Sequence, residues 1–344
     1  MKQPTLTIVI GMHRSGTSLI SRSLQVFGIS HGSNMLFGSD NAKGHWEEQE
    51  FIDLNDKILN LLDRKWSSIS PIKSTEWSKI EMESLTNEAR DLMLNRLNLY
   101  ANYGFKDPRT TLLLPFWHNI CQLLGVTPKF IFSIRSPFDV AASLKDRNEF
   151  PTSRSLYIWL NYNLSALKFL STPDRSYVVV DYKAMIENPG AELERVSRMI
   201  NIPPRAQELD AYIRNFVDPK LNHHSKHIHR SACNDALLNC VLDVHEFLLS
   251  ATHKPEILKT PDGLAKIQQW SDEMIRHQRL LELCDRAFDE AQRSQESAAH
   301  ATAARSHAEA ELNAVLMTQS WKLTQPLRAI KQLIRPLISI ANNS

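Results

Sequence analysis

The sequence GMHRSGTS, residues Gly11–Ser18, follows directly after the apolar run Leu6–Ile10 and precedes apolar residues at helical spacing. The local pattern is therefore a strand, a glycine loop and a helix. Gly11 and Gly16 have the spacing of the two glycines in the pattern G-x-x-x-x-G-K-[ST], in which backbone N–H groups at a helix N-terminus hold an anion. This stretch predicts a phosphate-binding loop; the alternative is an ordinary glycine turn before a helix.

The loop departs from that pattern at one informative position. Thr17 stands where the lysine is expected, and a cation is found instead at Arg14, inside the loop. A nucleotide triphosphatase uses that lysine to reach the transferred phosphate, so the substitution argues against this class.

A second candidate phosphate site follows the strand-like run Lys129–Ile134. Arg135 comes directly after this run, Pro137 marks the start of a helix, and Ser143 lies eight residues beyond Arg135. A guanidinium and a hydroxyl that converge can bind a phosphate monoester. The alternative is a strand-capping arginine and a buried helical serine.

Together the two motifs resemble those of sulfotransferases that use 3′-phosphoadenosine 5′-phosphosulfate (PAPS), over residues 1 to about 230. The first looks like their 5′-phosphosulfate loop, R-[SG]-G-T-[ST], and the second like their 3′-phosphate clamp, R-[DNS]-P-x-[DE]-x-x-x-S. The resemblance implies that PAPS is the cosubstrate and that no metal is needed. It implies that Arg14 faces the bridging oxygen of the leaving phosphate. The nucleotide-binding residues that it implies are His13, Arg14, Ser15, Gly16, Thr17, Ser18, Arg135 and Ser143.

Two carboxylates, Glu47 and Glu48, open an expected helix over residues 46–63. Acidic residues are favoured there by the helix dipole, which is the structural interpretation. The segment Lys43–Glu47 also resembles the pattern N-x-K/R-G-[HYF]-[WF]-E of bacterial sulfotransferases, whose glutamate lies near the acceptor. Sulfation of a hydroxyl requires a general base. We expect Glu47 to be that base, with Glu48 as the second candidate.

The tetrapeptide Lys106-Asp107-Pro108-Arg109 also resembles this family, in which it lies close to the reaction centre. Lys106 and Asp107 therefore join Arg14 and the two glutamates as candidate catalytic residues. Without the resemblance, Asp107-Pro108 would be a turn that caps a helix.

The order of the apolar segments predicts an α/β fold. Strands are expected at residues 6–10, 129–134 and 176–182, and helices at residues 46–63, 76–103, 152–171 and 191–200, with Gly104 ending the second helix. This alternation predicts a P-loop-like three-layer α/β/α domain with a central parallel sheet, whose ligands bind at the carboxyl ends of the strands.

Three regions are expected along the chain. Residues 1–230 form the PAPS-binding domain, residues 231–290 form a helical extension with helices at 232–254 and 261–292, and residues 291–344 form an exposed helix or weak coiled coil with an amphipathic tail. A basic and histidine-rich run near residues 218–230 has three interpretations: a metal site, a solvated connector, or a flap in which Lys220 covers the nucleotide.

The composition limits the partners and the compartment. Forty Lys and Arg against 38 Asp and Glu give a formal charge of +2, which argues against a general nucleic-acid binder. The four cysteines have no C-x-x-C spacing, and no run of 18 apolar residues is present, so we expect a cytoplasmic protein.

The tail suggests the setting in which the chain acts. Gln319–Arg328 resembles S-W-[RK]-[LI]-T-x-P-[LY]-R, a tail sequence of bacterial glycan-assembly proteins, and a basic amphipathic stretch follows it. The resemblance implies a carbohydrate or glycan acceptor, sulfated on a hydroxyl or an amine. The tail either packs on the catalytic domain or docks to the inner face of a membrane or an assembly partner.

Two other functions remain open. One is a P-loop kinase or nucleotide hydrolase, against which Thr17 argues. The other is a noncatalytic nucleotide-binding adaptor of a glycan-assembly complex, against which the intact loop cation, clamp and base candidates argue.

Overall fold

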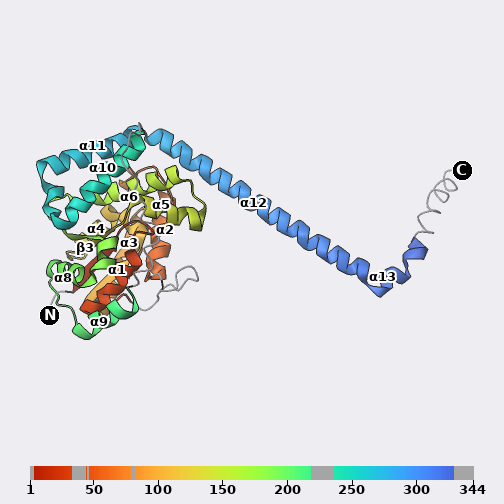
Figure 1. Cartoon of the computed structure of the whole chain (residues 1–344), viewed down its shortest axis with the longest axis horizontal. Coiled ribbons are helices and arrows are strands. Elements are labelled where there is room, and N and C mark those ends of the chain that lie inside the picture. Colours follow the sequence, from red (N-terminus) through yellow and green to blue (C-terminus); the bar gives the residue numbers. More distant parts are fainter. Residues whose placement is uncertain (1–3, 33–43, 45, 79–81, 218–234, 329–344) are drawn as a thin grey trace. The chain divides into compact units, whose positions relative to one another are not determined.

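The computed structural model describes residues 4–32, 44, 46–78, 82–217 and 235–328 (Figure 1). The chain divides into two compact units, Met1–Glu282 and Leu283–Ser344. The first unit is built around a sheet of four parallel strands in the order β2-β1-β3-β4. The strands are β1 (Thr5–Ile10), β2 (Asn102–Lys106), β3 (Lys129–Ile134) and β4 (Ser176–Asp181).

The parallel arrangement gathers the predicted motifs at one edge of the sheet. Because all four strands run in the same direction, the residues that follow them lie at the same edge. The glycine loop follows β1, Asp107 follows β2, and Arg135 follows β3. The predicted α/β domain with a central parallel sheet is confirmed, as are three of its strands.

The strand β2 was not predicted. The spacing of apolar residues predicts a helix through residue 103 that ends at Gly104, whereas helix α3 (Met82–Leu99) ends earlier and Gly104 lies inside the strand. A side chain at Gly104 would place its Cβ 2.8 Å from a methyl group of Leu24. Gly104 therefore permits close packing rather than ending a helix.

The outer side of β2 is bonded to a single residue. Ser30 N donates to Asn102 O at 3.0 Å, and Gly104 N donates to Ser30 O at 2.9 Å. Ser30 and Tyr103 form an isolated parallel bridge. One residue thus satisfies two backbone groups at this edge of the sheet.

Successive side chains of a strand point to opposite faces of the sheet, so strands that are buried throughout need helices on both faces. Helices cover both faces here. On one face Val9, Ile131 and Val178 are buried in one apolar cluster with residues of four helices. These helices are α1 (Thr17–Ser23), α7 (Tyr182–Glu187), α8 (Pro189–Ile200) and α9 (Ala206–Asn215).

The other face is rich in aromatic contacts. Phe105 of β2 stacks on Phe51 with ring centroids 4.2 Å apart and also contacts Trp117, while Phe130 of β3 contacts Phe169. These partners belong to α2 (Gln49–Leu61), α4 (Leu114–Leu123) and α6 (Thr152–Leu170). Helix α5 (Pro137–Asn148) packs against α6.

The helices after residue 235 continue the first unit. Helix α10 (Ala236–His253) packs against β4 and α6, and α11 (Pro261–Arg276) packs against α6. The compact unit ends at Glu282, so most of the expected extension, residues 231–290, lies within it. The single helix expected over 261–292 is interrupted at His277, where α12 (Gln278–Met317) follows α11.

The second unit contains the greater part of α12 and the short helix α13 (Gln319–Leu323). Within the ranges that the structure describes, no helix is both long enough and apolar enough to cross a membrane.

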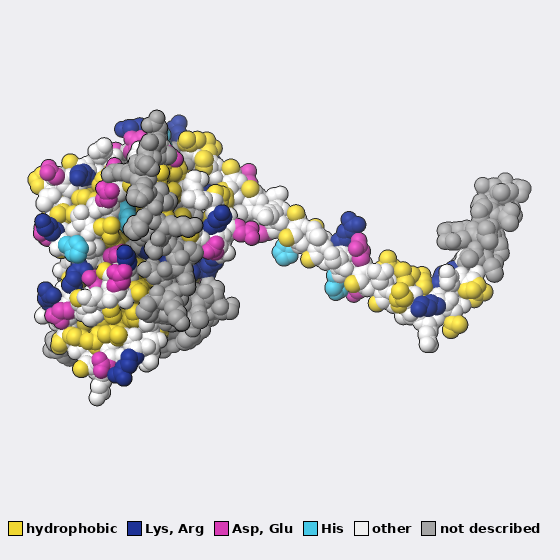
Figure 2. All heavy atoms as spheres, in the orientation of Figure 1, with side chains coloured by type: hydrophobic (Ala, Val, Ile, Leu, Met, Phe, Trp, Pro, Cys, Tyr) yellow, Lys and Arg dark blue, Asp and Glu magenta, His cyan; other side chains and the backbone are white. Residues whose placement is uncertain are grey.

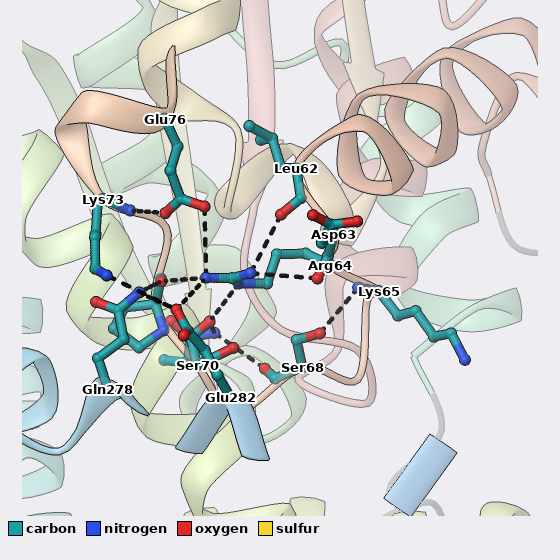
Figure 3. Close-up of polar contacts among 12 residues, drawn as sticks. Leu62, Asp63, Arg64, Lys65, Ser68, Ser70, Lys73, Glu76, Gln278 and Glu282 are labelled. Atoms are coloured by element: carbon teal, nitrogen blue, oxygen red, sulfur yellow. Dashed lines mark hydrogen bonds and ion pairs between the residues drawn. The ribbon is translucent and has the colours of Figure 1, made fainter. Parts of the chain in front are cut away.

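Arg64 holds the irregular segment after α2 to the first turns of α12 (Figure 3). Its side chain is only 6% exposed, and its guanidinium pairs with Glu282 of α12 at 3.2 Å and with Glu76 at 3.6 Å. Gln278 of α12 donates to Pro71 O at 3.1 Å and to Glu282 at 2.8 Å. The same guanidinium donates to four backbone carbonyls, those of Leu62, Asp63, Ser70 and Pro71.

We predict that Arg64→Ala lowers the free energy of unfolding by about 3 kcal/mol, because four backbone carbonyls lose a charged donor and two partly exposed carboxylates lose a cation. The control is Lys57→Ala, which removes a pair with Glu88 in which both side chains are about half exposed. It should cost less than about 1 kcal/mol. Urea unfolding measures both changes, and equal costs would contradict a structural role for the Arg64 contacts.

Candidate active site

The glycine loop has the backbone of an anion cradle. Gly11 and Gly16 have φ values of 144° and 84°, and Gly16 is the residue before α1. A Cβ at Gly11 would lie 2.5 Å from Ser133 O, and one at Gly16 would lie 2.2 Å from the Tyr182 ring. Both positions therefore require glycine on grounds of backbone conformation and of space.

Arg14 is fixed by contacts with the second motif. Its φ of 67° is unusual for a residue with a side chain, and its backbone oxygen accepts a hydrogen bond from Arg135 Nη1 at 3.1 Å. Its side-chain Nε donates to Ser143 Oγ at 2.7 Å, across 129 residues of sequence. The structure thus brings the loop and the predicted clamp into direct contact.

Arg135 is held from several sides. Its guanidinium lies 4.4 Å from the centroid of the Tyr182 ring and 3.8 Å from Asp139, and its backbone oxygen accepts from Trp159 Nε1 at 3.1 Å. These contacts fix the arginine at the end of β3 without occupying all five of its donors.

Lys106 and Glu47 form a buried ion pair beside the loop. Lys106 Nζ donates to Glu47 Oε1 and, at 3.3 Å, to Ser18 Oγ. The alternation along β2 explains the placement: Lys106 is paired with Val9 and points to the side of the sheet that α1 covers. One ammonium group therefore joins the carboxylate to the glycine loop.

Glu48 lies in a different environment from Glu47. Its carboxylate accepts from Arg96 Nε at 2.7 Å and from the Tyr103 hydroxyl at 2.8 Å. Burial raises its pKa, against the hydrogen bonds from Arg96 and Tyr103. Neither glutamate caps α2, although Glu48 occupies the position before its first residue. The two carboxylates that are adjacent in sequence therefore have separate partners.

Asp107 is fully buried and points toward the opposite side of the sheet from Lys106. Its carboxylate accepts from Asn55 Nδ2 at 2.8 Å, from Arg109 Nη1 at 2.9 Å and from the Arg109 backbone N–H at 3.1 Å. Burial raises the pKa of Asp107 to about 6; the Arg109 charge opposes this shift and the Glu47 charge adds to it. The carboxylate also caps the short helical turn Pro108–Thr111, as a turn with a cap predicts.

His13 lies in the loop among aromatic rings and cations. Its ring centroid is 4.7 Å from that of Trp66 and 6.1 Å from that of Tyr162. Burial lowers the pKa of His13 well below its usual value, and the charges of Arg109 and Lys106 lower it further. The imidazole is therefore neutral near pH 7.

The remaining nucleotide candidates belong to the loop itself. Ser15 is buried, and its backbone oxygen accepts from Ser133 Oγ at 2.7 Å. Thr17 is the first residue of α1 and is also buried. Lys220, Lys43 and His45 lie outside the described residues.

Three further residues position the site and were not predicted as site residues. Thr111 Oγ1 bonds to both the N–H and the carbonyl of Gly11, at 2.9 and 3.1 Å. Asn55 donates to Asp107 and accepts from Trp117 Nε1 at 2.8 Å. The Tyr182 ring contacts the Arg135 guanidinium and fills the space that a side chain at position 16 would need. Only Asn55 gave a sequence signal, because it is a polar residue four positions after Phe51 on the apolar side of α2.

Solved structures that this chain resembles include several sulfotransferases. The sulfotransferase domain of the Synechococcus PCC 7002 olefin synthase is 17% identical, with a TM-score of 0.43 over 72% of this chain and 96% of that one. The sulfotransferase domain of the curacin biosynthetic pathway is 15% identical, with a TM-score of 0.44 over 72% and 99%. The sulfotransferase STF9 of Mycobacterium avium is 15% identical, with a TM-score of 0.41 over 72% and 76%. No protein-family model and no curated protein matches the sequence.

The raised pKa of Asp107 predicts a pH-dependent stability. Between pH about 4 and about 6 the folded state retains a proton that the unfolded state has lost, so stability falls as the pH rises through this range. Asp107→Asn should lack this contribution, whereas Asn replacement of the exposed Asp91 should leave the slope unchanged. Urea unfolding across the pH range measures the difference, and parallel wild-type and Asp107→Asn curves would contradict it.

Proposed function

We propose that this chain is a PAPS-dependent sulfotransferase that moves a sulfuryl group to an acceptor hydroxyl. The observation that carries the proposal is the hydrogen bond between Arg14 and Ser143, at 2.7 Å. These residues come from the two phosphate motifs that the sequence predicted separately, and PAPS is a nucleotide with phosphate groups at two positions. A single ligand could therefore contact both motifs.

The proposed nucleotide site divides its work between the two motifs. Arg135 and Ser143 would bind the 3′-phosphate, because a guanidinium and a hydroxyl supply charge-assisted hydrogen bonds to a phosphate monoester. The loop amides and the hydroxyls of Thr17 and Ser18 would bind the 5′-phosphate. The positive φ of Arg14 and the close packing of both loop glycines support a preformed site.

The proposed reaction is a direct in-line transfer. A lone pair of the acceptor oxygen forms the new S–O bond while the bond between sulfur and the bridging oxygen of the 5′-phosphate breaks, which leaves 3′-phosphoadenosine 5′-phosphate (PAP). Glu47 receives the acceptor proton. Lys106, which contacts both Glu47 and Ser18, would stabilise negative charge between the base and the phosphate.

The contacts favour Glu47 over Glu48 as the base. Glu48 accepts hydrogen bonds from a guanidinium and a phenol, whereas Glu47 accepts from the Lys106 ammonium, so protonation would weaken two buried hydrogen bonds at Glu48 and one at Glu47. Asp107 is similarly engaged by Asn55 and Arg109. Its proposed role is therefore to hold Arg109 and the turn beside the site.

The proposed acceptor is a bacterial carbohydrate or glycan, and the proposed compartment is the cytoplasm. The acceptor rests on the resemblance of Gln319–Arg328 to the tails of glycan-assembly proteins. A P-loop kinase and a noncatalytic adaptor are the alternatives. Preferential binding of ATP with Mg²⁺ would support the first, and binding of PAP without turnover of PAPS would support the second.

We predict that PAP raises the melting temperature more than AMP does, because only PAP carries a 3′-phosphate. Arg135→Ala should weaken PAP binding by about 1.5 to 3 kcal/mol, as expected for a hydrogen bond to a charged group. The control is Arg90→Ala, at an exposed arginine of α3. Titration calorimetry with PAP and AMP measures both. Stronger stabilisation by ATP with Mg²⁺ than by PAP would overturn the proposal.

The second prediction concerns the chemical step. Arg14→Ala should lower kcat roughly 100-fold, because the bridging oxygen gains charge only as its bond to sulfur breaks. Glu47→Gln should also lower kcat and leave PAP affinity within about two-fold, since the base does not hold the nucleotide. Conversion of PAPS to PAP with a panel of glycan acceptors measures the rates, and Glu88→Gln, at a half-exposed glutamate of α3 that pairs with Lys57, is the control.

The same assay can reject the assignment in two ways. Loss of kcat in Glu48→Gln or Asp107→Asn, with normal turnover in Glu47→Gln, would assign the general base to the residue whose variant is inactive. The proposed reaction would stay the same. Normal turnover in all of these variants would show that the proposed site is wrong.

A further inference from the structure

Exposed apolar side chains gather near the C-terminal end of the described chain, over Leu312–Arg328, which we call the tip. Leu312, Val315 and Leu316 have the i, i+3, i+4 spacing that places them on one face of α12, and they are 57%, 48% and 37% exposed. The other exposed large apolar residues of the tip are Met317, Trp321, Leu323 and Leu327. Between residues 284 and 311, which the structure describes throughout, no large apolar side chain is classed as exposed.

Figure 2 shows a group of hydrophobic atoms near this end of the described chain, with Lys or Arg atoms beside them. A group of exposed apolar side chains of this kind is typical of an interaction site.

The tip has a defined local structure. The Thr318 side-chain oxygen accepts a hydrogen bond from the Trp321 backbone N–H at 3.3 Å, so Thr318 caps the N-terminus of α13. Arg328 folds back over this turn: its guanidinium lies 3.7 Å from the centroid of the Trp321 ring and donates to Trp321 O and Thr324 Oγ1, both at 2.5 Å. An indole and a guanidinium are therefore presented together.

The charges change sign where the apolar residues begin. Residues 283–311 contain six acidic and three basic residues, whereas residues 312–344 contain four basic residues, Lys322, Arg328, Lys331 and Arg335, and no acidic one. Apolar groups beside cations without acidic neighbours match a surface with an apolar interior and anionic headgroups. Tryptophan is also favoured at the boundary between water and lipid.

From these observations we infer that the tip docks on an anionic phospholipid bilayer, with Trp321, Leu323 and Leu327 entering the interface and Lys322 and Arg328 contacting headgroup phosphates. A second copy of the chain is the less favoured occupant. Parallel copies would bring like-charged tips together. The exposed leucines at the start of α12, Leu280 and Leu283, are separated from Leu312 by residues 284–311, where no large apolar side chain is exposed, so a continuous coiled-coil seam is missing. The inference is independent of the proposed reaction.

The test is co-sedimentation of the full chain with vesicles. Vesicles of phosphatidylcholine with about 30 mol % phosphatidylglycerol should bind the protein at about 0.1 M salt and release most of it at about 1 M salt, because the attraction is partly electrostatic. Vesicles of phosphatidylcholine alone should bind it weakly. Equal binding to both vesicles, or binding to neither, would overturn the inference.

Substitutions separate the two contributions. Leu323→Ser should lower the partition coefficient about ten-fold by loss of apolar burial, and Lys322→Ala about five-fold by loss of one cation. The matched control is Leu99→Ser, which alters a leucine of α3 that is 63% exposed and lies outside the tip. It should leave the partition coefficient unchanged, and an effect equal to that of Leu323→Ser would overturn the assignment.

Sedimentation velocity tests the alternative, in which a second copy of the chain binds the tip. Self-association that Leu323→Ser abolishes, combined with no vesicle binding by the wild type, would assign the tip to a second copy. Unchanged thermal unfolding of the first unit in each variant shows that the substitutions act at the tip.

Discussion

The hydrogen bond from Arg14 to Ser143 is the contact on which the arrangement of the site depends. It joins a loop after β1 to a helix after β3, and the two can meet only because β1 and β3 are parallel neighbours. Their register pairs Ile10 with Phe132, so both strands reach the same edge within a few residues of each other. A second hydrogen bond, from Arg135 to the Arg14 carbonyl, also joins the glycine loop to the segment after β3.

Charge is concentrated at this edge although the chain as a whole is nearly neutral. Arg14, Arg135, Lys106 and Arg109 gather there with the carboxylates of Glu47, Asp56, Asp107 and Asp139. Each carboxylate is matched to a cation, which offsets part of the cost of burying it. The lowered pKa of His13 reflects its burial first and the nearby charges of Arg109 and Lys106 second.

The sequence predicted those parts of the fold whose signals are local. Buried parallel strands such as Lys129–Ile134 are continuous apolar runs, and the loop glycines have a fixed spacing, so both could be read directly. The strand β2 could not be, because its five residues contain a glycine and two polar residues and its pairing comes from distant parts of the chain. The separate partners of Glu47 and Glu48 were equally invisible, since they depend on the distant residues Lys106, Arg96 and Tyr103. The break between α11 and α12 at His277 could not be predicted, because the helical spacing of the apolar residues continues on both sides of it.

The bridge from Ser30 to β2 also bears on how this chain avoids aggregation. An open edge strand offers a row of free amides and carbonyls on which the strand of another molecule can assemble. Here the outer edge is five residues long, and Ser30 already occupies the Asn102 carbonyl and the Gly104 amide. Growth of the sheet from this side would first have to displace a contact that also holds the chain leaving α1. A single residue of irregular backbone thus blocks this edge of the sheet against the addition of a strand from another molecule.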